Sequence, residues 1–200
     1  MTKLPAIVVA GLGRCGTSLM MQMLQAGGVK CIGDWPAFET SASMFGSFDP
    51  AAFAALRGTA IKLIDPARLP IGAMPNHIVI WLDRGVVEQA RSQIKMVRGF
   101  GGPVASNRQT LRAMVSGLRS DRAPNMAAIG AKGRLPSIAL TFDRLLTHPT
   151  KTAADLYLFL RAHGYELDLV KMVKQIRGRS PACYPGMMEI ELLGQRGIAA

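Results

Sequence analysis

Cysteines, aromatic residues and long apolar runs are all scarce in this sequence, and each shortage excludes a class of protein. Three cysteines, Cys15, Cys31 and Cys183, form no disulfide framework and no zinc-ligand spacing, which fits a reducing compartment. No apolar run approaches the ~18 residues that span a bilayer, and no cleavage-type site follows the N-terminus. We therefore expect a cytoplasmic protein without a signal peptide or a membrane span.

Acidic residues are also few, since 13 Asp and Glu stand against 24 Lys and Arg, which leaves a net charge of +11. Such a charge steers anionic ligands toward a basic cleft. Aromatic residues make up only 6%, and no basic run is interleaved with them, so nothing specifically indicates nucleic acid. The 49% hydrophobic content and the 200 residues predict one domain over residues 1–200, with a C-terminal tail from about 178.

The most informative stretch joins an apolar run, a glycine-rich turn and a helical segment. Ala6–Ala10 is typical of a buried strand, the glycines free the backbone to turn, and Ser18–Ala26 is predicted to be helical. The N-terminus of a helix presents unpaired N–H groups and partial positive charge. Together these features predict a cradle for a phosphate-type anion.

Three loop templates compete for this cradle. The nucleoside triphosphatase form requires Lys after its last glycine, but Thr17 follows Gly16, which argues against a kinase or an ATPase. The dinucleotide form GxGxxG matches Gly11, Gly13 and Gly16, and Asp34 stands where that form places its acidic residue. An NAD(P)-binding oxidoreductase or sensor is therefore one alternative.

The third template is the 5′-phosphosulfate loop of the sulfotransferases. Residues 11–20 (GLGRCGTSLM) resemble the GxPRSGTS-type loop of bacterial members, with Gly13 in place of the usual proline and Cys15 in place of serine. The resemblance implies that the loop binds 3′-phosphoadenosine 5′-phosphosulfate (PAPS) through Gly11, Gly13, Arg14, Cys15, Gly16, Thr17 and Ser18. We interpret Cys15 as a small residue that fills the loop; the alternative is a thiol with a lowered pKa, because Cys15 sits at a helix N-terminus beside Arg14.

A second motif favours the interpretation of the loop as a sulfotransferase loop over its interpretation as a dinucleotide-binding loop. Arg84 follows a predicted strand at 78–82, and Ser92 lies eight positions later on a predicted helix. The pair resembles the sulfotransferase element that holds the 3′-phosphate of the donor, and residues 92–96 (SQIKM) are similar to the SQxKM of bacterial members. Here Asp83 precedes the arginine, whereas the family usually has Arg-Asp.

A third, more generic match completes the resemblance, which spans about residues 5–170. Residues 137–149 are similar to a strand–EDLLxDP–helix segment, whereas the RKG-type segment of animal enzymes is only echoed at 131–133. Alternating strands and helices predict an α/β fold, a P-loop-like parallel sheet flanked by helices. The predicted strands are 6–10, 29–32, 60–64, 78–82 and 138–142, and the predicted helices 18–26, 50–56, 86–97, 107–119, 152–162 and 168–176.

Sulfuryl transfer requires stabilisation of the leaving phosphate and a base for the acceptor proton. Arg14 and Lys62 are the candidates for the first role. For the second we expect Glu39, where bacterial members often show an aromatic-Glu pair, with Asp34 as the runner-up. We interpret His77, His148 and His163 as structural or surface residues.

The sequence thus predicts a sulfotransferase that uses PAPS, releases adenosine 3′,5′-bisphosphate (PAP) and needs no metal. Its acceptor would be a hydroxyl or amine on a small molecule, a glycan or a peptide, whose identity the sequence leaves open together with the oligomeric state. The other alternative is a catalytically silent nucleotide-binding protein, because the loop is altered and no obvious base is present.

Overall fold

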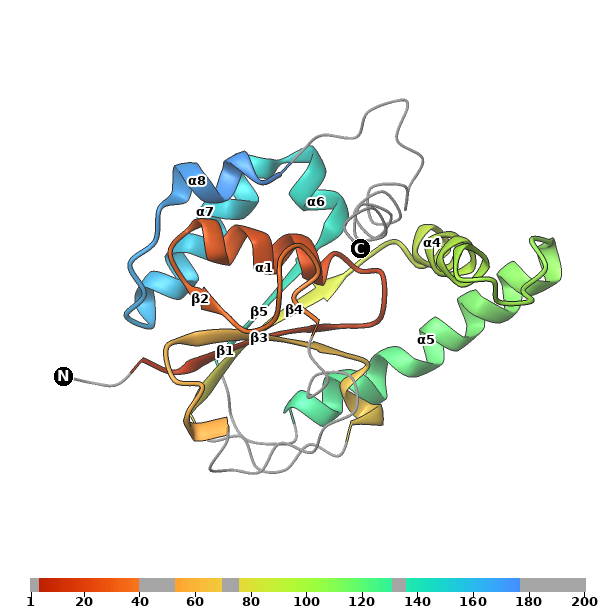
Figure 1. Cartoon of the computed structure of the whole chain (residues 1–200), viewed down its shortest axis with the longest axis horizontal. Helices are drawn as coiled ribbons and strands as arrows, with labels where there is room; N and C mark the ends of the chain where they lie inside the picture. The colour runs from red at the N-terminus through yellow and green to blue at the C-terminus, as the bar shows by residue number, and fades with distance from the viewer. Residues whose placement is uncertain (1–3, 40–52, 70–75, 131–135, 177–200) are drawn as a thin grey trace, which may run out of the picture.

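The computed structural model describes residues 4–39, 53–69, 76–130 and 136–176. A single sheet of five parallel strands, in the order β2–β3–β1–β4–β5, forms its centre (Figure 1). The strands are β1 (Ala6–Gly11), β2 (Lys30–Cys31), β3 (Thr59–Ile64), β4 (His77–Asp83) and β5 (Ser137–Thr141). The predicted α/β class with a parallel sheet is confirmed.

The central strand β1 is buried along its whole length, as its run of apolar residues predicts. It pairs with β3 on one side and β4 on the other, so that Val9 lies beside both Lys62 and Ile80. The strand predicted at 29–32 is shorter, because β2 is an edge strand that pairs with β3 through only two residues. In parallel pairing all carboxyl ends meet at one edge, where ligands of such sheets bind.

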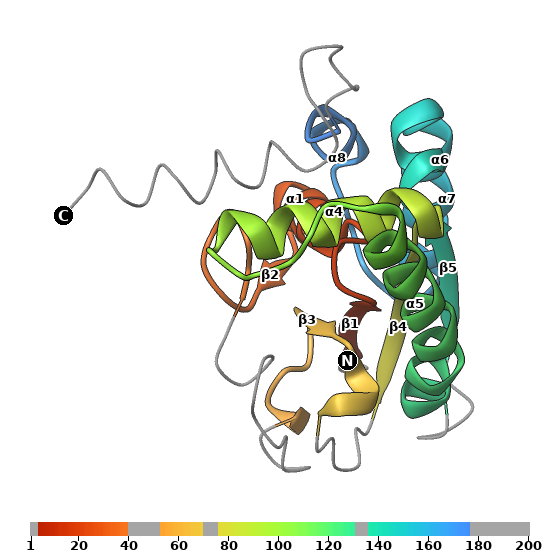
Figure 2. The same ribbon diagram turned by 90° about the vertical axis from the view of Figure 1, so that its right-hand side faces the viewer.

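Helices cover both faces of the sheet (Figures 1 and 2). One face packs against α1 (Thr17–Ala26), α7 (Pro149–Ala162) and α8 (Leu169–Lys174) around the larger core, which includes Met20 and Leu156. The other face carries a smaller core that Ile129 of α5 (Arg108–Gly130) helps to close. The sheet therefore lies between two apolar layers.

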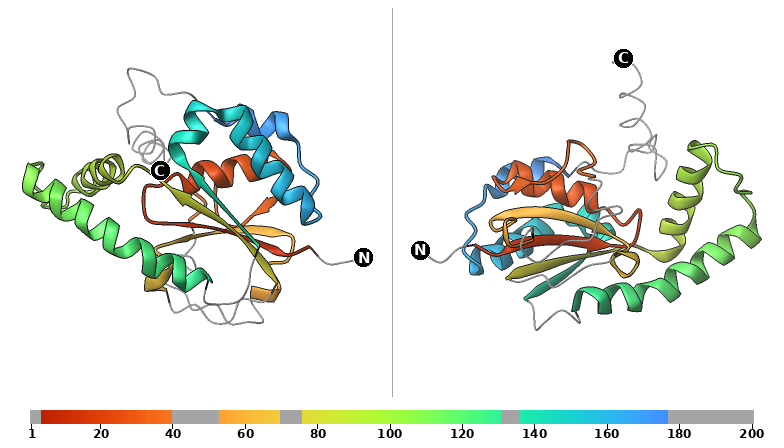
Figure 3. Two further views of the ribbon diagram at one scale, coloured as in Figure 1. Left: turned by 180° about the vertical axis from the view of Figure 1, so that it is seen from behind. Right: turned by 60° about the horizontal axis from the view of Figure 1, so that its bottom comes forward.

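Helix α4 (Val86–Gly99) packs against the first half of α5, and the two helices extend beyond the sheet as a hairpin (Figure 3). The sequence predicted α5 to end at residue 119, but it continues through Pro124 to Gly130. Leu118, Asn125 and Ile129 lie on one helical face and are buried. Asn125 also accepts a hydrogen bond from the N–H of Ala67 in the 3₁₀ turn η1 (Pro66–Arg68), at 2.8 Å. Tertiary packing thus outweighs the unfavourable proline.

Two further boundaries differ from the sequence prediction. The strand predicted to end at Phe142 stops at Thr141, whose side chain caps the short helix α6 (Phe142–Thr147) by accepting from the Arg144 N–H at 3.2 Å. Helix α7 begins at Pro149 rather than at 152, since proline suits a first helical turn. Residues 50–52 of the helix predicted at 50–56, and the tail from 178, lie outside the described residues, and in the described part of that helix residues 53 and 54 are helical and 55–56 form a turn. Among the helices in the described ranges, none has the length and apolarity to cross a membrane.

Candidate functional site

The predicted glycine loop lies between β1 and α1, at the carboxyl edge of the sheet. Gly16 has φ 99° and precedes α1, and as a glycine it supplies no side-chain cap to the first N–H groups of the helix. A Cβ on Gly16 would lie 2.5 Å from the Phe142 ring, and one on Gly11 would lie 2.6 Å from the carbonyl oxygen of Leu82. Both glycines are therefore required by the packing around the loop.

Arg14 has the left-handed conformation, with φ 70°, and its side chain reaches helix α4. The Arg14 Nε donates to the Oγ of Ser92 at 3.0 Å, and Ser92 is fully buried. The loop arginine and the helix serine, 78 positions apart, thus form one contact. The sequence analysis paired Ser92 with Arg84 and did not predict its contact with Arg14.

Arg84 joins the same cluster from the end of β4. Its Nη1 donates to the carbonyl oxygen of Arg14 at 3.1 Å, and its Nη2 donates to Glu88 Oε1 at 2.7 Å. The guanidinium lies over the Phe142 ring, 4.6 Å from the centroid. The buried Arg84 Nε has no hydrogen-bond partner among the described residues. A buried donor of this kind is costly unless a ligand or water supplies an acceptor.

The positive charges of this cluster act on one another. Burial and the neighbouring Arg84 lower the pKa of Arg14 to about 10, and the carboxylate of Glu39 opposes that change. Asp83, which precedes Arg84, accepts instead from Arg122: the single N–H of Arg122 Nε is shared between the two carboxylate oxygens, at 3.1 and 3.2 Å, and Nη2 also donates. An anion placed between Arg14 and Arg84 would therefore relieve repulsion between two half-buried or buried cations.

Lys62 forms the second part of the site, on β3 beside the loop. Its side chain is 1% exposed, and its Nζ donates to Ser18 Oγ at 3.3 Å, to Glu39 Oε1 at 3.2 Å and to the carbonyl oxygen of Ala37. Burial lowers the pKa of Lys62, and the Glu39 carboxylate opposes the shift. The structure thus brings together the predicted residues Lys62, Glu39 and Ser18.

Gly13 is held by protein groups on both sides. Gln89 and Gln93 donate to its carbonyl oxygen at 2.8 and 3.0 Å. Burial raises the pKa of Asp65, and a hydrogen bond from the Gly13 N–H opposes that rise. The sequence analysis missed these three supports. The spacing of Gln89, Ser92 and Gln93, which places all three on one face of α4, was the available signal.

Cys15 is buried, as a residue that fills the loop would be, and the alternative of a reactive thiol is wrong. The thiol belongs to the buried core beneath the loop, and a Cβ on Gly11 would collide with its sulfur. Burial raises the Cys15 pKa to about 12, against a usual value of 9.0. Thr17 is buried as well. Only the backbone of these two positions is available to an anion, whereas Ser18 remains half-buried.

The strand order separates the features on which the dinucleotide alternative depends. Asp34 is exposed after β2, but β3 lies between β2 and the loop strand β1. Strands are spaced about 4.8 Å apart, so the two ends are about 10 Å from each other. The dinucleotide fold instead pairs its first two strands directly, which puts the acidic residue beside the glycine loop.

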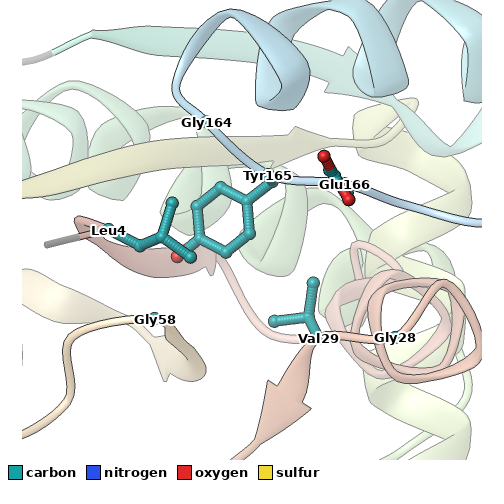
Figure 4. Close-up of a pocket in the computed structure, with 7 residues that line it drawn as sticks. All are labelled: Leu4, Gly28, Val29, Gly58, Gly164, Tyr165 and Glu166. Atoms are coloured by element: carbon teal, nitrogen blue, oxygen red, sulfur yellow. The ribbon is translucent and has the colours of Figure 1, made fainter. Parts of the chain in front are cut away.

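Two other features lie away from this edge, and one of them, His77, was predicted to be structural. His77 is buried against the Phe53 ring at the opposite end of β4, as a structural residue would be. A hollow of about 320 Å³ also opens at the amino ends of the strands, and Leu4, Val29 and Glu166 line part of it (Figure 4). It is therefore remote from the glycine loop.

Strand order 2-3-1-4-5 with a glycine loop after the first strand defines the class of P-loop-like α/β proteins. The chain is similar to the crystal structure of mouse sulfotransferase SULT7A1 complexed with PAP, with a TM-score of 0.58 and 13% identity, over 93% of this chain and 71% of that one. No protein-family model and no curated protein matches the sequence. The protein therefore has the sulfotransferase fold, as the sequence resemblance predicted.

Proposed function

We propose that this protein is a sulfotransferase that uses PAPS to modify a hydroxyl or amine of an acceptor. The observation that carries the proposal is the single cluster formed by Arg14, Arg84 and Ser92, with a buried Arg84 donor facing no described acceptor. That the similar mouse enzyme was crystallised with PAP supports the same ligand class here. The cytoplasmic location and the bacterial type remain predictions.

In this proposal the two phosphate-bearing ends of the donor bind to neighbouring groups. The phosphosulfate accepts hydrogen bonds from the N–H groups at the start of α1, where the helix carries partial positive charge, and from the Arg14 side chain. The 3′-phosphate binds Arg84, because the Arg84 Nε–H has no acceptor among the described residues and can donate to a phosphate oxygen. Ser92 positions Arg14 between them.

The chemistry then needs one bond made and one broken. The acceptor oxygen or nitrogen attacks sulfur, the bond from sulfur to the bridging oxygen breaks, and negative charge collects on the departing phosphate of PAP. Arg14 and Lys62 lie on either side of the loop to stabilise that charge. The acceptor proton passes to the carboxylate of Glu39, which is 46% exposed while Lys62 fixes its position at 3.2 Å.

The second candidate function is a nucleotide-binding protein without turnover. It rests on the contact between Lys62 and Glu39, because a carboxylate that already forms an ion pair within the protein has a structural role without any turnover. Both candidates predict PAP binding, and only the first predicts release of PAP from PAPS in the presence of an acceptor.

Thermal unfolding with and without ligand tests the binding step directly. A ligand that binds only the folded state raises Tm, and at a hundred times Kd the gain is about 2.7 kcal/mol, or several degrees for a domain of this size. We expect such a rise with PAP at millimolar concentration and a smaller one with adenosine 5′-monophosphate. No rise with PAP contradicts the proposal, and a rise with NADH alone favours the dinucleotide alternative.

A further inference from the structure

Asp83 brings a negative charge to the edge of the proposed nucleotide site. It is the last residue of β4 and directly precedes Arg84, so the two Cα atoms are about 3.8 Å apart. Its carboxylate also contributes to the raised pKa of Cys15 beneath the glycine loop, so its charge acts on that loop as well. Because like charges repel over such distances, an uncompensated carboxylate here would weaken the binding of a phosphate.

Glu88 and Asp83, two of the carboxylates near Arg84, differ in where their cationic partner comes from. Glu88 pairs with Arg84 itself at 2.7 Å, within the proposed site. Asp83 pairs with Arg122 of α5, a helix that supplies none of the proposed contacts to the nucleotide. The charge of Asp83 is therefore compensated from outside the site.

The contact between Asp83 and Arg122 has a forked geometry. Arg122 Nε donates a shared hydrogen bond to the two carboxylate oxygens, at 3.1 and 3.2 Å, and Nη2 donates to one of them. Paired, charge-assisted bonds of this kind fix the direction of a carboxylate and compensate its charge. They also raise the pKa of Arg122. Asp83 is 24% exposed, so water screens its charge only in part, and the cation beside it matters.

The packing of α5 explains why Arg122 reaches Asp83. Leu118 and Asn125 are buried, and at spacings of four and three residues they lie on the same side of the helix as Arg122. Arg119 differs, since it lies about 100° around the helix from Leu118. It is exposed and forms no ion pair within the part of the chain that the structure describes. The two arginines therefore carry the same charge on one helix, and only Arg122 compensates an acid at the edge of the site.

We propose that Arg122 is a positioning residue for the nucleotide: it compensates and orients the Asp83 carboxylate, so that Arg84 binds the 3′-phosphate without competition from the adjacent acid. The inference rests on the proposed function, which supplies the identity of the nucleotide. The order of residues makes such a partner necessary, because Asp83 stands directly before the arginine. Without Arg122, the carboxylate would repel the phosphate or pair with Arg84 in its place.

Calorimetric titration of PAP at physiological ionic strength tests this role through the sign of two single variants. We expect Arg122→Gln to weaken PAP binding about fivefold, because one uncompensated charge at a partly hydrated position then acts on the 3′-phosphate. Asp83→Asn removes the acid and leaves the cation, so it should not weaken PAP binding. The double variant Asp83→Asn/Arg122→Gln carries neither charge and should bind PAP within about twofold of the wild type. A purely structural contact predicts a loss in both single variants, because each breaks the same hydrogen bonds.

Two controls separate this role from general charge and from folding. Arg119→Gln removes the same charge from the same helix and should change PAP affinity less than about twofold, since distant exposed charges are screened. Arg122→Lys keeps a cation beside Asp83 and should retain most of the affinity. Circular dichroism and Tm verify that each variant is folded.

Four results overturn the inference: an unchanged PAP affinity in Arg122→Gln, an equal loss in Arg119→Gln, an equal loss in Asp83→Asn, or a double variant that binds as weakly as Arg122→Gln. Each of these presupposes that the wild-type protein binds PAP, so each defeats the inference alone. A wild-type protein that does not bind PAP defeats the proposed function, and the inference with it.

Discussion

The two sides of the glycine loop differ in how many positive charges they bring together. On one side Lys62 meets the carboxylate of Glu39 at 3.2 Å, so that its charge has an opposite charge within the protein. On the other side two cations lie together: Arg14 donates to the neutral hydroxyl of Ser92, and its neighbour Arg84 pairs with Glu88 at 2.7 Å. The first arrangement is suited to holding a base in place, and the second to accepting an external anion.

The contrast also explains why Arg84 differs from an ordinary structural arginine. Glu88 accepts from one of its nitrogens and the Arg14 carbonyl oxygen from another, which fixes the plane of the guanidinium. Its Nε remains buried with no described partner. A side chain oriented in this way loses little entropy when a phosphate binds, so it is preorganised.

The largest expected effect concerns the Lys62 side of the comparison. Glu39→Gln removes the proposed base and keeps the shape, so we expect kcat to fall by about 10²- to 10⁴-fold. Binding of PAP should change little, because Glu39 contacts Lys62 rather than the arginine cluster. Steady-state release of PAP from PAPS measures the change. Asp34→Asn is the control, and a larger loss in that variant than in Glu39→Gln moves the base to Asp34.

The next effect concerns the arginine side. Arg84→Ala removes charge-assisted hydrogen bonds to the 3′-phosphate, each worth about 1.5–3 kcal/mol, so we expect PAP to bind about 10- to 100-fold more weakly. The affinity for adenosine 5′-monophosphate, which lacks the 3′-phosphate, should fall much less. Calorimetric titration of both ligands measures the difference.

A matched control for Arg84→Ala is Arg144→Ala, since Arg144 also faces an acid, Asp155, but from an exposed position. We expect it to leave PAP affinity unchanged. Equal losses of PAP and of adenosine 5′-monophosphate on Arg84→Ala would remove Arg84 from the 3′-phosphate role.

Ser92→Ala gives a smaller effect on the same side. The loss of one hydroxyl leaves Arg14 Nε without its acceptor at a half-buried position, at a cost of about 1 kcal/mol. We expect PAP affinity to fall about fivefold, and Ser92→Thr, which keeps the hydroxyl, to recover part of it. An unchanged affinity in Ser92→Ala would show that Ser92 does not position Arg14.

The smallest effect comes from Cys15, beneath the loop. Its pKa rises from 9.0 to about 12 on burial, so between these values the unfolded thiol is ionised while the folded one is not. Ionisation of Cys15 therefore leaves the free energy of unfolding unchanged below pH 9 and lowers it above pH 9. We expect the advantage of the wild type over Cys15→Ala in the free energy of unfolding to shrink by about 1 kcal/mol from pH 8 to pH 10.

Urea unfolding of both proteins at the two pH values measures this advantage. Rapid labelling of Cys15 by a thiol reagent in the folded protein at pH 8, or an advantage that does not change with pH, would contradict the assigned burial. Either result would return Cys15 to the reactive role that its position beside Arg14 suggested.

Much of the site was predictable because it depends on local pattern and parallel topology. The β1–loop–α1 unit follows from an apolar run and three glycines, and Arg84 follows from the end of a buried strand. Parallel strands then bring Arg14, Lys62 and Arg84 to one edge. Sequence spacing alone therefore sufficed to predict that these residues converge.

The remaining features depend on tertiary contacts that no local pattern carries. The Phe142 ring that excludes a side chain at Gly16 comes from a distant helix start, and the Lys62–Glu39 pair depends on how the segment after β2 folds back. The full length of α5 depends on the burial of Ile129. The alternative of a lowered Cys15 pKa was wrong because the side chain belongs to the core, whereas the interpretation as a loop-filling residue agrees with that burial.

A crystal structure of the protein with PAP tests the central assignment most directly. We predict one PAP molecule whose 5′-phosphate lies about 3 Å from the N–H groups at the start of α1 and whose 3′-phosphate accepts from Arg84 Nε at a similar distance. A PAP molecule bound elsewhere, or one whose 3′-phosphate points away from Arg84 while the 5′-phosphate occupies the loop, would contradict it.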